Sequence, residues 1–600
     1  MTEKKSTSSS QKRTNRRPQR RNNSPRPRNA QRTPHKSNAM PATKKNDNAV
    51  RFIPLGGLEE IGRNMSVFEY KDEIILIDMG LQFPEDDTPG IDYIIPNIES
   101  LLPKKDNIKG IIITHGHYDH IGAVPHLTKI LGGDIPIYTQ PLSKAIIERR
   151  QEDYPNTPKL KFITVKDRDR VKISKYFTAE FFETLHTIPD SVSVVLETPV
   201  GNIAYSSDLK IDYDIKGNPL GLDVYKDIQK RNIHTLFLES TGAERAGKSV
   251  SEELVEKNIE ALVMKAEGRL IVGMFASLLT RIKEIVDIAE RHGRKVFLSG
   301  FSLKTNMQIA QNLGYLKPKK GTILPIEEMH KYKDDRIMVL STGAQGEPNA
   351  SMMRIANGEH RFVTIKKSDT IIFSSSVIPG NERPIQVLKD NLTRQGARVY
   401  QTEHIDVHSS GHGPADDLKT VTKLIQPKHF IPIHGWYFMR AANVRNAQEV
   451  GIPRENCFLV DNGQIVEMDE KGVHPTAHSV PTNYVMVDGL GVGDVEHIVM
   501  RDRLALADSG MLVIIATLDR RTGKFVKNPD IISRGFIHLK SNKDIVEDVR
   551  KKVRNIVSKI PRVQTVEADY LKTLIREQIG QFIYSKTKRR PMILPVVIEV

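Results

Sequence analysis

Four potential metal ligands stand within six residues in the stretch His115-Gly116-His117-Tyr118-Asp119-His120-Ile121-Gly122. The apolar run Ile111-Ile112-Ile113 before it predicts a buried strand, and the spacing of apolar residues after it predicts a helix over Asp119–Leu131. Two histidines at i and i+2 leaving a strand can converge on one cation, while Asp119 and His120 can point at a second. Structural or incidental histidines would not explain so dense a set of ligands.

Strands predominate on both sides of this stretch. Apolar and β-branched runs between Gly or charged turns predict strands at Arg51–Leu55, Met65–Tyr70, Ile74–Asp78, Ser193–Glu197, Asn202–Tyr205 and His234–Leu238. The histidines are therefore expected at a strand-to-helix junction of a sheet protein rather than in a helical bundle.

A separate α/β unit is predicted further along the chain. A capping box, Ser249-x-x-Glu252, opens a helix, and helices then alternate with strands at Leu270–Met274, Lys295–Leu298 and Thr370–Ser374. After about Asp488 a last α+β unit is expected, with Met511–Leu518 as a strand and Ile545–Ile560 as a helix.

Charge and composition distinguish the first fifty residues from the rest. The chain of 600 residues has a net charge of +16, and Met1–Val50 supply 14 Lys and Arg against Glu3 and Asp47. This segment therefore carries +12 and leaves +4 for the remainder, and its lack of aliphatic residues predicts a disordered tail. The tail either attracts RNA or an acidic partner by counterion release, or is a solubilising or tolerated extension.

Membrane and secretory classes are excluded by pattern. The basic start is not followed by an apolar h-region, and no stretch approaches the roughly 18 apolar residues of a spanning helix. Cys457 is the sole cysteine, which excludes disulfides within the chain and thiolate metal sites. We expect a cytoplasmic protein whose metals are held by His and carboxylates.

The opening stretch resembles the HxHxDHxG motif of the metallo-β-lactamase superfamily, and later motifs match as well. His186 in Leu185-His186-Thr187-Ile188-Pro189-Asp190-Ser191 resembles the third motif, and Asp208 in Tyr205-Ser206-Ser207-Asp208 resembles the fourth. The final ligand of the superfamily matches His434 in Ile431-Pro432-Ile433-His434-Gly435. Taken alone, His186 or Asp208 would be read as a buried structural residue.

The 226 positions between Asp208 and His434 exceed the spacing of small-molecule hydrolases, and the insertion resembles the β-CASP domain of nucleic-acid processing members. Glu239 in Leu238-Glu239-Ser240-Thr241 matches its acidic motif, and His412 in His408-Ser409-Ser410-Gly411-His412 matches the next. His434 matches the third, where His accompanies RNA substrates in this family.

The resemblance narrows to the ribonuclease J family from about Arg51 to the end. It rests on Phe275-Ala276-Ser277, Ile378-Pro379-Gly380-Asn381-Glu382 and Pro529-Asp530-Ile531-Ile532-Ser533-Arg534-Gly535. Two departures stand out: Leu278 replaces the usual Asn, and Pro414 replaces a frequent Ser, which removes a backbone N–H from a phosphate-binding loop.

This resemblance implies an α/β fold: a metallo-β-lactamase αββα sandwich, an inserted β-CASP α/β domain and a small α+β C-terminal domain. The expected boundaries are a disordered basic tail at 1–48, the metallo-β-lactamase domain at 49–250 and 417–490, the β-CASP domain at 251–416, a linker at 491–505 and the C-terminal domain at 506–600.

By the same resemblance, His115, His117 and His186 hold one metal, Asp119, His120 and His434 hold another, and Asp208 bridges them. Two zinc ions suit this set, although manganese accepts the same ligands. The expected catalytic residues are Asp119, Glu239 and His412, with Glu239 orienting neighbouring groups and His412 clamping the scissile phosphate or donating a proton. A structural His in a Gly-rich turn is the alternative for His412. The expected RNA and phosphate contacts are Ser277, Arg281, Ser375, His408, His412 and Gly413.

The implied function is a metal-dependent ribonuclease of RNA decay and processing, including mRNA decay and rRNA processing. It would act as a 5′-to-3′ exonuclease preferring 5′-monophosphate ends and also as an endonuclease. The implied partners are RNA, further copies of the chain in a dimer or tetramer through the C-terminal domain, and an RNA helicase or the ribosome, with no membrane. A small-molecule hydrolase, a non-catalytic RNA-binding subunit and a DNA-processing enzyme remain the alternatives.

Overall fold

A computed structural model describes residues 46–84, 88–378, 380–493, 495, 497–539, 541–560 and 567–600. The expected disordered tail at 1–48 lies outside the described residues except for its last three positions. None of the described helices has the length and apolar character needed to cross a bilayer.

Two sheets form the centre of the catalytic domain. The first contains, in spatial order, β21 (Gly472–Ser479), β20 (Gln464–Asp469), β1 (Val50–Gly56), β2 (Met65–Tyr70), β3 (Glu73–Ile77), β5 (Ile108–Ile112), β6 (Pro136–Thr139) and β7 (Lys161–Thr164). The second contains β19 (His429–Ile433), β12 (Ile233–Glu239), β11 (Gly201–Tyr205), β10 (Val192–Thr198), β9 (Thr178–Glu183) and β8 (Arg170–Lys172). Both sheets contribute to one core, which includes Phe52 and Phe68 from the first and Phe181 and Phe237 from the second. Because the two sheets share this core, they are stacked face to face.

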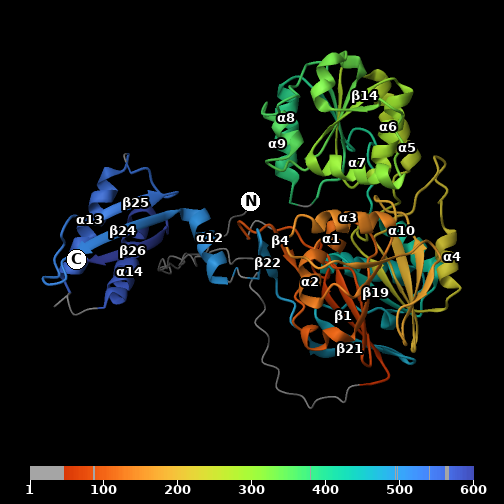
Figure 1. The fold of residues 1–600 in the computed structure, drawn as a ribbon, viewed down its shortest axis with the longest axis horizontal. Helices are drawn as coiled ribbons and strands as arrows, with labels where there is room; N and C mark the ends of the chain where they lie inside the picture. Colours follow the sequence, from red (N-terminus) through yellow and green to blue (C-terminus); the bar gives the residue numbers. More distant parts are fainter. Residues whose placement is uncertain are drawn as a thin grey trace, which may run out of the picture. The chain divides into compact units, whose positions relative to one another are not determined.

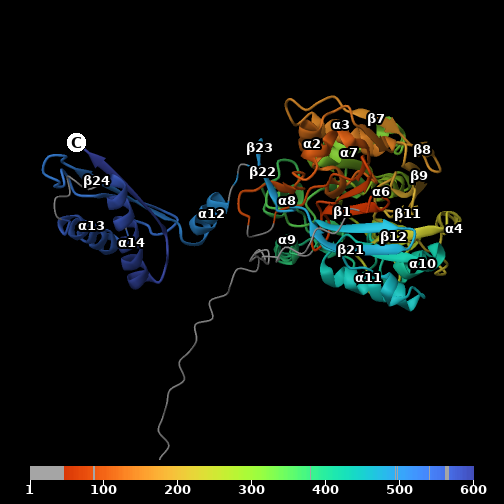
Figure 2. The ribbon, with the colours of Figure 1, turned by 90° about the horizontal axis from the view of Figure 1, so that it is seen from below.

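Helices cover the outer face of each sheet, as Figure 2 shows. On the first sheet lie α1 (Tyr118–Ile121), α2 (Val124–Leu131) and α3 (Pro141–Gln151), and on the second lie α4 (Asp223–Gln229), α10 (Ala415–Ile425) and α11 (Tyr437–Glu449). The expected αββα sandwich is confirmed. The single helix expected over Asp119–Leu131 is wrong: Pro125 sits in the first turn of α2, where its missing N–H costs nothing, and a new helix starts there.

The inserted domain is a parallel sheet between two layers of helices (Figure 1). Its strands, in spatial order, are β15 (Ile323–Leu324), β14 (Lys295–Ser299), β16 (Ile337–Ser341), β13 (Leu270–Met274), β17 (Thr370–Ser374) and β18 (Arg398–Tyr400). On one face lie α5 (Glu252–Lys265), α6 (Leu279–Arg291) and α7 (Phe301–Leu313), and on the other lie α8 (Ser351–Ala356) and α9 (Glu382–Arg394). The expected α/β insertion is confirmed.

The capping box predicted at Ser249 is wrong. Helix α5 begins at Glu252, and its N-cap is Ser251, whose hydroxyl accepts from the N–H of Leu254. The hydroxyl of Ser249 instead donates to the carboxylate of Asp417 in α10 at 2.6 Å, so it is not available to cap α5.

The C-terminal domain packs two helices on one face of a three-stranded sheet. Its strands, in spatial order, are β25 (Asp530–Arg534), β24 (Met511–Leu518) and β26 (Met592–Glu599), and its helices are α13 (Lys543–Ser558) and α14 (Ala568–Thr587). Helix α12 (His497–Ser509) occupies most of the range expected as a linker. A further small sheet joins β4 (Tyr93–Ile95), β22 (Val485–Asp488) and β23 (Gly491–Val492), and short 3-10 helices span Leu102–Asn107, Ile326–Lys331, Asp334–Arg336 and Arg454–Asn456.

Candidate metal centre

Five of the predicted metal ligands lie just beyond the ends of strands in the two stacked sheets, and two lie in the helix that follows β5. His115 and His117 follow β5, and His186, Asp208 and His434 follow β9, β11 and β19, respectively, while Asp119 and His120 lie in α1. Parallel pairing of β11 with β12 and of β12 with β19 carries Asp208 and His434 to the same edge. The two sheets together therefore gather side chains that are up to 319 positions apart in sequence.

Three histidines, two from the first sheet and one from the second, converge at one point. The Nδ1 atom of His117 lies 3.1 Å from Nε2 of His115 and 3.1 Å from Nε2 of His186. The Oδ2 atom of Asp208 lies 3.7 Å from the first of these Nε2 atoms and 3.9 Å from the second. These four residues form one set of groups able to hold a metal ion.

A second set shares Asp208. Its Oδ2 atom lies 3.2 Å from Nε2 of His120, and its Oδ1 atom lies 3.0 Å from Nδ1 of His434. Asp119 adds a carboxylate 3.5 Å from Nε2 of His120. His434 has a left-handed φ of 53°, unusual for a non-glycine residue, which turns its ring back after β19.

The two sets fit divalent metal ions. Zn–N bonds of 2.0–2.1 Å in tetrahedral geometry separate neighbouring ligand nitrogens by roughly 3.3 Å. The nitrogen of His117 lies 3.1 Å from those of His115 and His186, which is close to this value. Nε2 of His434 is buried and has no hydrogen-bond partner among the described residues, although buried polar atoms normally have one. The donors are imidazoles and carboxylates, which zinc and manganese both accept.

Backbone and carboxylate groups outside these sets orient the rings. The side chain of Asp78 lies 2.8 Å from Nδ1 of His120 and also accepts from the N–H and hydroxyl of Thr114. The carbonyl of Gly411 lies 2.8 Å from Nδ1 of His186. Each contact leaves Nε2 of the histidine directed at the centre. Sequence reasoning missed Asp78, which merely ends a predicted strand.

We expect Asp78→Asn to weaken metal binding about 10–100-fold, because an amide holds the His120 ring less well than a carboxylate does. Metal titration followed by RNA cleavage would measure the effect, and excess metal should restore most of the activity. A variant that binds metal like the wild type would contradict this role. Asp488→Asn, which changes a carboxylate outside the centre, is a suitable control.

Burial and neighbouring charges set the protonation of the site. Burial lowers the pKa of His115 and His186 well below the ordinary value, and that of His117 to about 4, so these rings are neutral and free to bind a cation. Burial also disfavours the cation of His120, but Asp208, Asp119 and Asp78 outweigh it and raise the pKa of His120.

A third set, Asp208, Glu239 and His412, lies beside the other two. One carboxylate oxygen of Glu239 accepts from the N–H of Leu209, and the other lies 3.2 Å from the N–H of Thr241 and 3.0 Å from Nδ1 of His412. Burial opposes the cation of His412, yet Glu239 and Asp208 raise the pKa of His412 to about 9. Both carboxylate oxygens of Glu239 already accept hydrogen bonds. This set therefore suits a protonated His412 bound to Glu239 better than a third metal ion.

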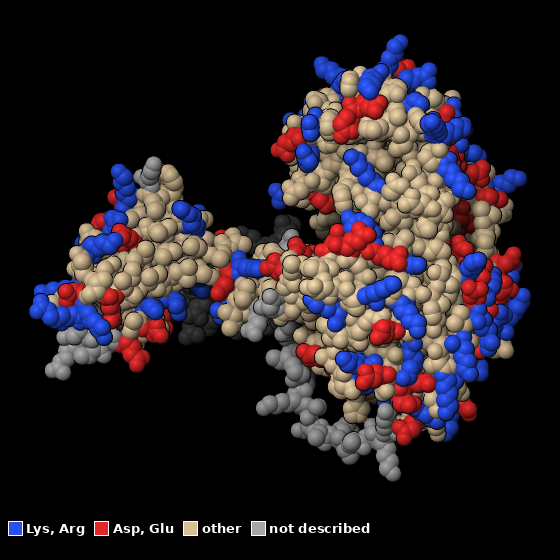
Figure 3. Space-filling view, viewed as in Figure 1, with Lys and Arg blue, Asp and Glu red and all other residues tan. Residues whose placement is uncertain are grey.

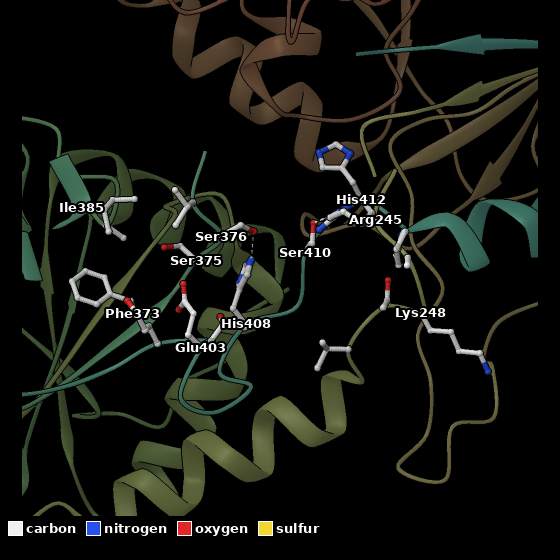
Figure 4. Close-up of a pocket in the computed structure, with 18 residues that line it drawn as sticks. Arg245, Lys248, Phe373, Ser375, Ser376, Ile385, Glu403, His408, Ser410 and His412 are labelled. Carbon is white, nitrogen blue, oxygen red and sulfur yellow. Dashed lines mark hydrogen bonds between the residues drawn. The ribbon is translucent and has the colours of Figure 1, made fainter. Parts of the chain in front are cut away.

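A pocket of about 270 Å³ adjoins His412. Figure 4 shows Ser375, Ser376 and His408 on one wall and Arg245 and His412 on the other. The hydroxyl of Ser376 lies 2.8 Å from Nε2 of His408. Lys248 also lines this pocket, and sequence reasoning missed both basic residues although they stand in a Gly-containing loop directly after β12.

Ser277, Arg281 and Gly413 are the remaining expected phosphate contacts. Ser277 and Arg281 do not line this pocket, and Arg281 is 3% exposed and paired with Glu252 and Glu284. The N–H of Gly413 donates to the carbonyl of Leu209 at 2.7 Å. Arg281 and the Gly413 N–H thus already have partners in this structure.

Comparisons with protein families match four parts of the chain. Residues 86–225 match a beta-lactamase superfamily domain, 267–392 the ribonuclease J beta-CASP domain, 398–456 a Zn-dependent metallo-hydrolase RNA specificity domain and 498–600 the ribonuclease J C-terminal domain.

Curated relatives match along almost the whole chain. Ribonuclease J2 of Bacillus subtilis is 35% identical over 93% of this chain and 100% of its own length, and ribonuclease J 1 of Streptococcus pyogenes is 35% identical over 92% and 98%. A solved protein of unknown function from Enterococcus faecalis shares the fold, with a TM-score of 0.50 at 15% identity over 70% of this chain and 100% of that one.

Proposed function

The chain belongs to the ribonuclease J family and is a metal-dependent ribonuclease, and we propose that it removes nucleotides from the 5′ end of RNA as well as cutting internally. The observation that carries the proposal is the pocket that adjoins His412, with hydroxyl and cationic groups on its walls. A pocket beside the candidate centre can hold a chain end at a fixed distance from the bond to be cut.

Two bound cations would lower the pKa of a water molecule and offset the charge that develops on the scissile phosphate. We assign these cations to His115, His117, His186, Asp119, His120 and His434, with Asp208 shared, and zinc is the proposed metal. His412 is held by Glu239 with its other ring nitrogen free. As a cation below a pH of about 9, it can clamp a phosphate oxygen or give a proton to the leaving 3′ oxygen.

The 5′-monophosphate is proposed to bind between Ser375, Ser376 and Arg245. A guanidinium and two hydroxyls can donate hydrogen bonds to phosphate oxygens, and the positive charge of the guanidinium strengthens the binding of the anion. One N–H group of Arg245 already donates to the carbonyl of His412 at 2.6 Å, so the guanidinium lies beside the loop that carries His412. Glu403 also lines the pocket and suits a ribose hydroxyl rather than a phosphate.

We expect Arg245→Ala or Ser375→Ala to slow degradation of 5′-monophosphorylated RNA about 10-fold or more, since each charge-assisted bond contributes roughly 1.5–3 kcal/mol. Cleavage of a circular RNA should change far less. Gel assays of both substrates would measure the ratio, with Arg394→Ala, an exposed arginine on α9, as the control. Equal losses on both substrates would assign these residues to general RNA binding or to the fold.

One experiment tests the proposed function as a whole. Purified protein with zinc or manganese is incubated with RNA carrying a 5′ monophosphate or a 5′ triphosphate, and with circular RNA. We expect mononucleotides chiefly from the 5′ monophosphate and internal cuts in the circle. Products that begin at the 3′ end would refute the proposed direction.

The open face of the C-terminal sheet supports assembly of several copies. Four apolar side chains there are each at least 37% exposed: Ile532, Leu594, Val596 and Ile598. Exposed apolar patches of this kind favour protein contacts, so we propose a homo-oligomer through this face. A helicase or ribosome partner stays a prediction. The single cysteine, Cys457, is buried and free, which suits the proposed cytoplasmic location.

A further inference from the structure

The charge of the described domains is distributed unevenly. Residues 506–600 contain 19 Lys and Arg against 10 Asp and Glu, a net charge of +9, whereas residues 51–505 contain 56 against 61, a net charge of −5. Figure 3 shows Lys and Arg side chains, in blue, over the C-terminal domain. A polyanion is therefore attracted to this domain more than to the catalytic part of the chain.

Several cations of this domain are paired with carboxylates. Lys527 pairs with Asp530 at 2.7 Å, Lys572 with Asp569 at 2.9 Å and Arg554 with Glu547 at 3.3 Å. These pairs lie on the surface and offer little net charge to a ligand.

Four other cations gather at one end of the sheet. Lys588, Arg589 and Arg590 follow α14, and a guanidinium N–H of Arg589 donates to the carbonyl of Phe536, two residues beyond Arg534. Arg534 lies at the same end, because it pairs across the sheet with Met511, which in turn pairs with Met592, but its side chain shares the open face of β25 with Ile532. All four side chains are exposed, and none forms an ion pair with a carboxylate among the residues that the structure describes.

An exposed aromatic ring lies within this cluster. Lys588 has a left-handed φ of 59° and ends α14, which turns the chain back over the last helical turn. The guanidinium of Arg590 then lies 4.4 Å from the ring centroid of Tyr584, and the ammonium of Lys588 lies 5.4 Å from it. Tyr584 is 39% exposed.

The helix end alone does not explain the cluster. Cations near a helix C-terminus interact favourably with its dipole, which accounts for Lys588 and its neighbours in part. It does not account for the exposed ring of Tyr584, which lies against two of these cations. Unpaired cations around an aromatic ring are the combination that proteins use to bind single-stranded nucleic acid, with phosphates on the charges and a base on the ring or on the guanidinium.

We propose that Tyr584, Lys588, Arg589 and Arg590 form a second RNA-binding surface that holds single-stranded RNA outside the candidate metal centre and the pocket beside it. This inference rests on the proposed function for the nature of the ligand. The surface binds the substrate chain through phosphates and stacking, without reading its sequence.

Salt dependence provides the test. Binding of a labelled single-stranded RNA with nuclease-resistant phosphorothioate linkages is measured with the full chain at several salt concentrations. For the triple variant Lys588→Ala, Arg589→Ala and Arg590→Ala we expect the slope of log K against log salt to shrink by up to about 2, or about 0.7 for each lost phosphate contact. The control Lys527→Ala, Arg554→Ala and Lys572→Ala removes the same charge from paired positions and should keep the slope.

A second comparison tests stacking. Tyr584→Ala should weaken binding of this RNA about fivefold or more, while Tyr584→Phe, which keeps the ring, should bind like the wild type. Equal slopes for the two triple variants would overturn the inference. Unchanged binding together with loss of an oligomer in sedimentation would also overturn it, and would assign the cluster to contacts between copies.

The proposed function is judged separately. The triple variant should cleave an RNA of a few nucleotides at the wild-type rate, because such a substrate does not reach the second surface. If wild-type protein cleaves no RNA, the proposed function fails whatever the binding data show. If cleavage is normal and the slope is unchanged, only the second surface is refuted.

Discussion

His117→Ala and Asp119→Ala are each expected to lower RNA cleavage by a factor on the order of a thousand or more, because each removes a donor from the proposed two-metal centre. His117 is the histidine whose ring nitrogen lies within 3.1 Å of two others. Asp119 contributes a carboxylate to the second set, and burial alone would raise its pKa, but the charge of His120 lowers it to about 2. Asp119 is therefore ionised at neutral pH.

The fold should survive both substitutions, since neither side chain is fully buried and neither belongs to the apolar core. Circular dichroism and metal analysis would be compared with turnover in the same preparations. His474→Ala, which removes an exposed imidazole from β21, should leave activity unchanged and serves as the control. Turnover near the wild-type value in a variant that has lost one metal would refute the two-metal assignment.

His412→Ala is expected to slow cleavage about 10²–10⁴-fold, the usual contribution of a positioned proton donor, while metal content stays near that of the wild type. His412 belongs to neither of the two metal-binding sets around His117 and His120. A loss of metal in parallel with activity would instead place His412 among the ligands. Metal analysis thus separates the two roles.

The pH dependence of cleavage gives a more specific expectation for His412 and its partner Glu239. The pKa of His412 is raised to about 9, so the ring is protonated below this pH and loses its proton, and with it the rate, as the pH rises through it. Glu239→Gln removes the charge that contributes most to this rise. The alkaline decline of kcat should therefore move toward the ordinary histidine pKa of about 6.5. An alkaline limb that stays near 9 in Glu239→Gln would contradict proton donation by His412.

Local signals in the sequence predicted individual strands and the cluster of potential ligands from His115 to His120, whereas the remaining ligands were assigned by resemblance. Apolar runs mark β1, β5 and β12, and the ligands follow such runs within a few residues. The strand ends that carry the ligands belong to two stacked sheets, and the metallo-β-lactamase resemblance supplied the topology that brings them together. This is why residues as distant as His115 and His434 could be assigned to one centre.

Contacts between distant side chains could not be predicted in this way. Arg281 stands at a position on α6 that looks available to a phosphate, yet Glu252 at the start of α5 faces it and forms an ion pair. Asp78 carries no sign of its role in its own neighbourhood, because its partners come from β5 and α1. A periodic pattern predicts which face of a helix or strand is buried. It does not predict which charged side chain of a neighbouring element contacts that face.

The position of β19 and β20 in the sheets has a consequence for synthesis of the protein. One neighbour of β12 is β19, and one neighbour of β1 is β20, so two strands made early pair with strands made about 200 and 400 residues later. A chain emerging from the ribosome in N- to C-terminal order contains the HxHxDHxG stretch long before it contains His434. The unfinished polypeptide thus lacks both a ligand and the strands that close its sheets. The metal centre therefore cannot assemble on the ribosome until residues 429–469 have been made.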